Sequence, residues 1–138
     1  MKVVYSIIGI ILGIPALYFI VMYGASELGG EVVTLDRTQQ NGEVSQVRIW
    51  IVDQADMSLI EHGDPEDFWL SQLKESPHLV LHRAGRTNTY LSRPDPDSHA
   101  LYHELRREKY GWADNLIAAL SGSTADCRGL PVRLQLPD

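Results

Sequence analysis

Two side chains on one face of a predicted strand have the chemistry to hold a flat anionic ligand. Arg48 and Trp50 lie two residues apart in the stretch Val44 to Asp53, and alternate residues of a strand project from the same face. A guanidinium group binds phosphate through paired hydrogen bonds, and an indole ring stacks on a flat ring system. The pair therefore suits a flavin-type cofactor. The alternative is a surface arginine paired across the sheet with a glutamate.

A second candidate site lies where a predicted strand gives way to a helix. His62 and Gly63 follow the apolar end of the stretch Met57 to His62, and a helix start is marked by Asp64 and Pro65. Amide groups at a helix N-terminus favour an anion, so a phosphate or the carbonyl edge of a flavin ring would fit there. The alternative is a plain turn with a capping aspartate.

A third candidate joins two predicted helices. Tyr110 and Trp112 flank Gly111, and the two rings would close over a flat ligand with the Tyr110 hydroxyl donating a hydrogen bond to substrate. Tyr110 is therefore the predicted catalytic residue. In the alternative, these aromatic side chains plug the end of a barrel.

The histidines and the single cysteine are less informative. His78 and His82 share one strand face, and His99 and His103 are four residues apart on a predicted helix. Neither pair has an obvious third ligand nearby in sequence, so we predict surface histidines and no metal site. Cys127 is the only cysteine; it forms no internal disulfide, and nothing marks it as a nucleophile.

The elements that must position these residues are mostly strands. Alternating or β-branched stretches predict strands at 31–37, 44–53, 57–62, 78–83, 87–93 and 131–136. Helices are predicted from Asp64 to Lys74, from Asp97 or Ser98 to Gly111, and over Ala113 to Leu120, with a loop over 121–129. The order β-β-β-α-β-β-α-α-β predicts an α+β fold: an antiparallel barrel-like sheet with helices packed at its openings.

An uncharged apolar stretch precedes this domain. Residues 3–23 are long enough to cross a bilayer, so we predict a transmembrane anchor over 1–23 that contacts lipid, a flexible linker over 24–30 and a domain over 31–138. A cleaved signal peptide is the main alternative, although the long run and bulky Met22 and Tyr23 disfavour it. Lys2 and the amino terminus place the N-terminus in the cytoplasm and the domain on the extracytoplasmic side.

Composition limits the class of partner. The net charge is −6 and the basic residues are scattered, whereas a nucleic-acid surface needs a basic stripe. About 110 residues remain after the anchor, which is one ordinary domain. Nucleic acid is therefore not an expected partner.

Three segments together carry a family resemblance. Arg48-Ile-Trp-Ile-Val-Asp, Ile60-Glu-His-Gly-Asp-Pro and the pattern Trp69-Leu70-x-x-Leu73-Lys74-x-x-Pro77 are similar to segments of the split-barrel flavin-binding superfamily, which includes pyridoxamine-phosphate oxidases. The last pattern resembles a helix of the deazaflavin-dependent nitroreductase and quinone-reductase family. The resemblance implies an antiparallel split β-barrel, cofactor binding that involves Trp69, and commonly a homodimer with the cofactor at the subunit interface.

One departure from the family pattern concerns the cofactor. Deazaflavin-binding members usually have a cationic stretch before the second strand, whereas residues 38–43 here contain no cation. FMN, an F420-type deazaflavin, heme or no cofactor all remain open.

The predicted function is a membrane-anchored oxidoreductase-like domain that reduces a small lipophilic acceptor, a quinone or nitro compound. The alternative is a non-catalytic membrane-tethered binding module on the same fold. Trp50 and Val52 lie on the face of the predicted strand 44–53 that also carries polar side chains, called here the mixed strand face. These two apolar side chains must be covered by another part of the structure. A partner subunit, a cofactor or the chain's own helix with Leu116, Ile117 and Leu120 would provide this cover.

Overall fold

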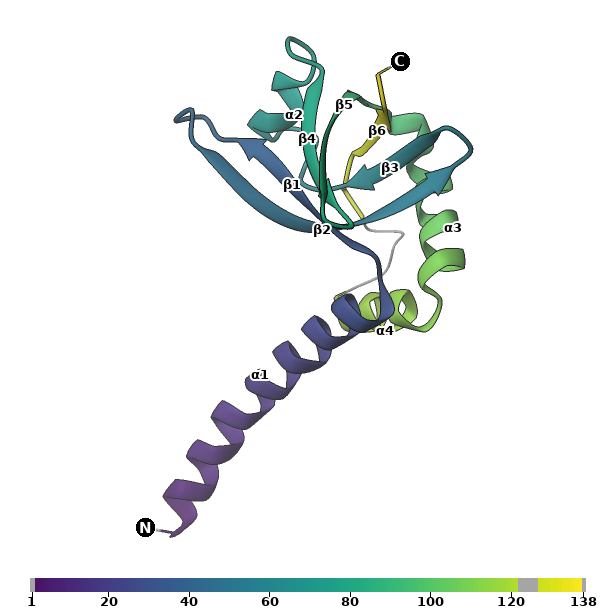
Figure 1. The fold of residues 1–138 in the computed structure, drawn as a ribbon. Helices are drawn as coiled ribbons and strands as arrows, with labels where there is room; N and C mark the ends of the chain where they lie inside the picture. The colour runs from purple at the N-terminus through teal and green to yellow at the C-terminus, as the bar shows by residue number, and fades with distance from the viewer. Residues whose placement is uncertain (1, 122–126, 138) are drawn as a thin grey trace.

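Six antiparallel strands form a closed barrel in the order β1-β2-β3-β6-β5-β4 (Figure 1). The computed structural model describes residues 2–121 and 127–137. The strands are β1 (Val32–Thr38), β2 (Val44–Gln54), β3 (Met57–Glu61), β4 (His78–Arg83), β5 (Arg86–Pro94) and β6 (Pro131–Gln135). The predicted α+β fold class and the order of elements are confirmed, because pairing of β1 with β4 closes the sheet.

The helices are α1 (Lys2–Gly29), α2 (Phe68–Gln72), α3 (His99–Tyr110) and α4 (Trp112–Ser121), with a short 3₁₀ turn η1 (Pro96–Ser98) before α3. Helix α2 begins later than predicted, because residues 64–67 form a turn and Asp67, not Asp64, precedes the first helical residue. Helix α4 reaches Ser121, and residues 122–126 of the predicted loop lie outside the described part of the chain.

Tight hairpins set the strand register. Gly42 has φ +82°, as the predicted Asn41-Gly42 turn requires, and the β4–β5 turn has Ala84 and Gly85 at φ +49° and +74°. Two successive residues with positive φ are typical of the two-residue turns that match the twist of the flanking strands.

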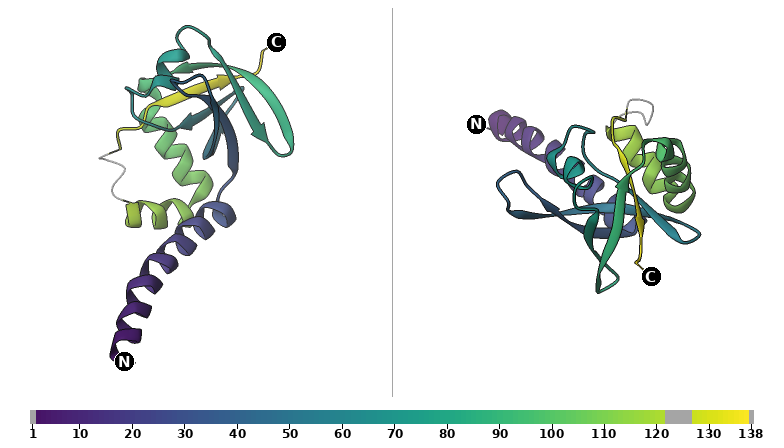
Figure 2. Two further views of the ribbon diagram at one scale, coloured as in Figure 1. Left: turned by 90° about the vertical axis from the view of Figure 1, so that its left-hand side faces the viewer. Right: turned by 90° about the horizontal axis from the view of Figure 1, so that it is seen from above.

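The two faces of β2 belong to different cores. Ile49 and Ile51 point into the barrel with Leu35, Leu81 and Leu134. Trp50 and Val52 alternate with them and pack outside the barrel against α3 and α4, together with Tyr102, Tyr110 and Ala113. The cover over the mixed strand face is therefore the chain's own helices, as Figure 2 illustrates from two further directions.

Helix α1 projects away from the barrel (Figure 1). Its stretch Gly9–Gly29 has a mean hydropathy of 1.8 and is only 6% buried, so it is not a core helix. The helix is long and apolar enough to cross a membrane, a property that signal sequences share.

The expectation of a flexible linker after this helix is wrong. Residues 24–29 continue α1, and Ala25 is buried. The carbonyl of Ser26 accepts a hydrogen bond from Trp50 Nε1 at 3.3 Å, and α1 contacts α4. These contacts offset the low helix propensity of Gly24 and Gly29.

Candidate functional site

The predicted site residues fall into two separate groups. Arg48 faces α1, where its guanidinium forms a two-contact ion pair with the Glu27 carboxylate, Nε to Oε1 at 3.2 Å. The partner is thus a glutamate from α1, not one across the sheet. The fork that was expected to bind phosphate is occupied by the chain itself.

Trp50 and Tyr110 also contact each other and not an open pocket. Their ring centroids lie 4.5 Å apart. The Tyr110 hydroxyl accepts from the Ile51 amide at 3.3 Å and is within hydrogen-bond distance of the carbonyl oxygens of Ile51 and Glu31. Burial raises the pKa of Tyr110. Tyr110 therefore packs on the outer face of β2, whereas Trp112, the second ring of the expected pair, is 60% exposed.

The second group surrounds a surface groove beside α2. The groove consists of two adjoining hollows of about 230 and 160 Å³, which share Arg37, Thr38 and Trp69. The first hollow is also lined by Gln39, Gln40, Asp67 and Phe68. The end of β1, the β1–β2 hairpin and α2 thus form its walls.

His62 lies next to this groove. Arg37 Nη1 donates to His62 Nε2 at 3.3 Å, and the His62 ring lies 6.3 Å from the Trp69 ring between centroids. Burial, reinforced by the Arg37 charge, lowers the pKa of His62. The imidazole is therefore neutral at pH 7, and Arg37 carries the positive charge of this group.

Gly63 provides a backbone conformation that the turn between β3 and α2 requires. Its φ is +85°, and a Cβ at this position would lie 2.1 Å from Asp67 Oδ2. The Asp67 carboxylate accepts a hydrogen bond from the Asp64 amide at 3.2 Å. An acidic side chain therefore lies beside Gly63, and the Asp67 side chain makes no capping hydrogen bond to α2.

Trp69 offers an unused donor at the groove. The side chain is buried, with 4% of its surface exposed, and its Nε1 has no hydrogen-bond partner among the described residues. A buried N–H without a partner carries a desolvation cost. Because Nε1 is itself buried, a ligand acceptor in the groove would remove that cost only after the indole shifts.

Sequence reasoning missed Arg37. Residues 38–43 contain no cation, but Arg37 lies immediately before them, near the end of β1, and lines both hollows. The signal available in the sequence was the position of Arg37 immediately before the predicted hairpin.

The surface prediction for the histidines needs a correction. His78 is exposed and His82 is half-buried, but His103 is buried with 7% exposure because α3 packs against β2 and β3. Helical spacing alone did not indicate which face of α3 meets the barrel.

No family model and no curated protein matches this sequence, but solved structures match the fold. HutZ, the heme storage protein from Vibrio cholerae, aligns with a TM-score of 0.55 at 12% identity, over 78% of this chain and 82% of HutZ. The F420-H2 dependent reductase FDR-A aligns with a TM-score of 0.51 at 13% identity, over 76% and 94%. A pyridoxamine 5'-phosphate oxidase-like protein from Listeria innocua gives 0.52 at 9%, over 78% and 85%.

This chain has their split-barrel fold. The structural neighbours are pyridoxamine-phosphate-oxidase-like split-barrel proteins, as the sequence resemblance predicted, and they include an F420-H2 dependent reductase and a heme storage protein. At these identities the likeness establishes the fold.

Proposed function

We propose that the split barrel binds a flavin-type cofactor, FMN or an F420-type deazaflavin, in the groove beside α2 and reduces a small lipophilic acceptor such as a quinone or nitro compound. One observation carries the proposal: Arg37 and Trp69 line one groove of this barrel, and His62 contacts both of them beside it. They combine a cation, a neutral imidazole and an indole with an unused donor.

Each residue has a distinct part in the proposed site. Arg37 pairs with the phosphate of the cofactor, since a guanidinium binds phosphate through two hydrogen bonds. Trp69 donates its unpartnered N–H to a ring oxygen. His62 holds the Arg37 guanidinium in position, and Gly63 permits the turn that carries His62. The bound cofactor supplies the electron chemistry.

The size of the groove favours a second copy of the chain. Pockets that enclose an organic ligand have volumes of about 300–1,000 Å³, and the two open hollows, of about 230 and 160 Å³, only together reach the lower end of that range. One chain would therefore hold one end of the cofactor, and a partner chain would cover the rest. This arrangement agrees with the resemblance to proteins that bind cofactor at a dimer interface.

We place α1 across a membrane, with the barrel on the extracytoplasmic side. The length and exposure of α1 support the membrane placement, and Lys2 supports the orientation. A lipophilic acceptor dissolved in that membrane would be near the barrel. A reporter fused after Asp138 should be active only outside the cytoplasm, and cytoplasmic activity would reverse the orientation.

A non-catalytic, membrane-tethered binding module is the second candidate. The observation that favours it is the face around Arg48, Trp50 and Tyr110, which is filled by the chain's own side chains. In that case the groove would bind a ligand without turnover.

A spectroscopic titration separates these functions. The full chain, purified in mild detergent, is titrated with FMN and with F420, and reduction of a soluble naphthoquinone is then measured with reduced cofactor. Binding with turnover is expected. Binding without turnover favours the non-catalytic module, and no binding of either cofactor contradicts both the cofactor and the reductase proposals. Light scattering with and without cofactor tests the dimer.

A further inference from the structure

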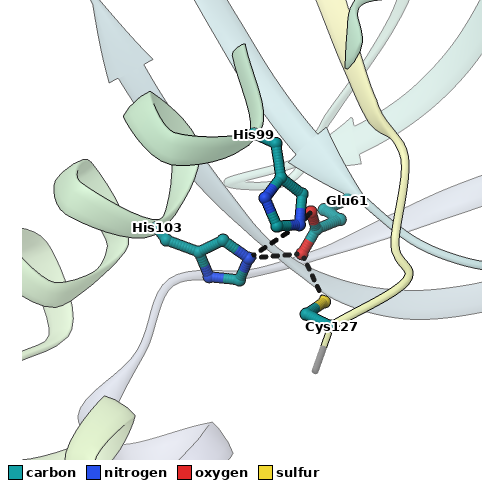
Figure 3. Close-up of side chains that lie close together, drawn as sticks. All are labelled: Glu61, His99, His103 and Cys127. Carbon is teal, nitrogen blue, oxygen red and sulfur yellow. Dashed lines mark hydrogen bonds and ion pairs between the residues drawn. The ribbon is translucent and has the colours of Figure 1, made fainter. Parts of the chain in front are cut away.

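Four metal-ligating side chains meet on the side of the barrel covered by α3 (Figure 3). Glu61 ends β3, His99 and His103 lie one turn apart on α3, and Cys127 precedes β6. One ligand atom from each lies within 4.8 Å of the others. Three segments that are distant in sequence therefore contribute to one cluster.

The spacing of the atoms suits a tetrahedral ion. His99 Nε2 and His103 Nε2 are 3.2 Å apart, and they lie 3.3 and 3.4 Å from Glu61 Oε1 and Oε2, respectively. Cys127 Sγ is 3.4 Å from Glu61 Oε2. Ligands at about 2.0–2.3 Å from a tetrahedral zinc ion lie about 3.3–3.8 Å from one another.

The Glu61 carboxylate is buried without a strong cationic partner. Its side chain is 5% exposed, and its Oε1 has no hydrogen-bond partner in the described chain. Its ion-pair contacts among the described residues are the two histidines. The nearby Arg106 pairs instead with Asp114, Nε to Oδ1 at 2.6 Å. A buried carboxylate is costly unless a cation or hydrogen bonds offset it.

His103 presents its Nε2 to the cluster from a buried position, with 7% of the residue exposed. Its Nε2 lies 3.2 Å from His99 Nε2 and 3.4 Å from Glu61 Oε2. One cation bound between these atoms would satisfy their lone pairs together.

The backbone at Gly129 passes close to Glu61 and thereby brings Cys127 to the cluster. A Cβ on residue 129 would lie 2.6 Å from Glu61 Cγ and 2.7 Å from Glu61 Cδ. Only a glycine lets the chain pass this close to Glu61, and the same approach places Cys127 at the carboxylate.

We propose that Glu61, His99, His103 and Cys127 bind one divalent transition metal ion, with zinc as the best match. Two imidazole nitrogens, a carboxylate oxygen and a thiolate sulfur form a borderline-soft set that suits Zn²⁺ in tetrahedral geometry. Binding releases the thiol proton of Cys127 to solvent. Four protein ligands make a closed, structural site that joins β3, α3 and the segment before β6.

A cobalt titration tests the proposal. The full chain in detergent, stripped with a chelator and kept reduced, is titrated with Co²⁺ and then with Zn²⁺. We expect one Co²⁺ per chain with a thiolate-to-cobalt absorption band, displacement by Zn²⁺, and a higher melting temperature with Zn²⁺. Absence of the band, or binding only at the affinity of a chain that lacks the cluster, overturns the site. Metal binding is measured without flavin, so its failure leaves the cofactor proposal intact.

Matched variants define the ligands. His99→Gln should weaken Co²⁺ binding at least 10-fold and Cys127→Ser should remove the thiolate band. His82→Gln is the control, because His82 and His99 side chains are equally exposed at 34% and His82 pairs with Asp36 on the opposite part of the barrel. Circular dichroism confirms folding. Equal Co²⁺ affinity in the His99 and His82 variants contradicts the proposal.

Discussion

Glu61 and His62 are neighbours in sequence but face different sites. Glu61 turns towards His103 on α3, Oε2 to Nε2 at 3.4 Å, whereas His62 accepts a hydrogen bond from Arg37 at the groove. Successive residues at the end of a strand point to opposite sides. The end of β3 therefore contributes one residue to the proposed metal site and the next to the proposed cofactor site.

This arrangement predicts separable losses. His62→Gln should weaken FMN or F420 binding several-fold and leave Co²⁺ affinity unchanged, while His99→Gln should have the reverse effect. Each variant serves as the control for the other, and both affinities are measured by absorbance titration. If either variant reduced both affinities equally, the two sites would not be independent.

The two arginines predict a second contrast. Arg37→Ala should raise the dissociation constant for the cofactor by about 10-fold or more, because a hydrogen bond to a charged group contributes about 1.5–3 kcal/mol. Arg48→Ala should leave it unchanged and lower the stability only slightly, since its pair with Glu27 is exposed and screened by solvent. If Arg48→Ala weakened cofactor binding more than Arg37→Ala does, the cofactor site would lie at β2 instead.

Tyr110→Phe separates a structural role from a catalytic one. The change leaves the Ile51 amide without its acceptor, and a buried unsatisfied donor costs about 1–3 kcal/mol. We expect a lower unfolding midpoint in denaturant but the same turnover per folded molecule. A large loss of turnover at unchanged stability would identify Tyr110 as catalytic.

A charged network at the barrel end predicts acid sensitivity. Arg83 contacts Glu31 at 2.6 Å and Asp53 at 2.7 Å, and its hydrogen bonds lower the pKa of both carboxyls. Carboxyls with depressed folded pKa values stabilise the fold fully above their unfolded values of about 4, and this stabilisation is lost as pH falls through the folded values. Unfolding midpoints measured from pH 7 down to pH 2 should therefore decrease.

Asp53→Asn should make this pH profile shallower, because the variant cannot be protonated at that position. Glu104→Gln, an exposed acid on α3, is the control and should retain the wild-type slope. Identical slopes for the wild type and the Asp53 variant would show that the network does not control acid stability.

Gly129→Ala tests the backbone approach to the metal cluster. The added methyl group would overlap Glu61 Cγ, so the segment carrying Cys127 or the Glu61 side chain must move. We expect Co²⁺ affinity to fall at least 10-fold with a weaker thiolate band. Gly24→Ala is the control, since an added Cβ there meets nothing within 4 Å. Unchanged cobalt spectra in both variants would contradict the close-approach argument.

The barrel was predictable because its signals are local. Alternation in β2, the Asn41-Gly42 turn and the helical spacing of Leu116, Ile117 and Leu120 each depend on residues near one another in sequence. The fold and the order of its elements follow from them. The end of α1 was not predictable in this way, because its last turns depend on contacts with Trp50 and Ala113.

The candidate sites depend on contacts between distant segments, and the sequence indicates these poorly. His99 and His103 were visible as a pair, but Glu61 and Cys127 reach them only after the barrel closes. Arg48 and Trp50 have suitable chemistry on one strand face, yet α1 and α3 cover that face. The residues that cover a strand face decide which side chains remain available to a ligand.

The continuous helix α1 has a mechanical consequence. Its 28 residues extend about 42 Å at about 1.5 Å per residue, whereas a bilayer's hydrocarbon core is about 30 Å thick. On the proposed membrane placement, about two turns stand above the hydrocarbon, and contacts with Trp50 and α4 hold the end of the helix against the rest of the domain. The barrel is then held at a set distance from the membrane surface and in one orientation. Acceptors reach the groove beside α2 at that distance from the hydrocarbon.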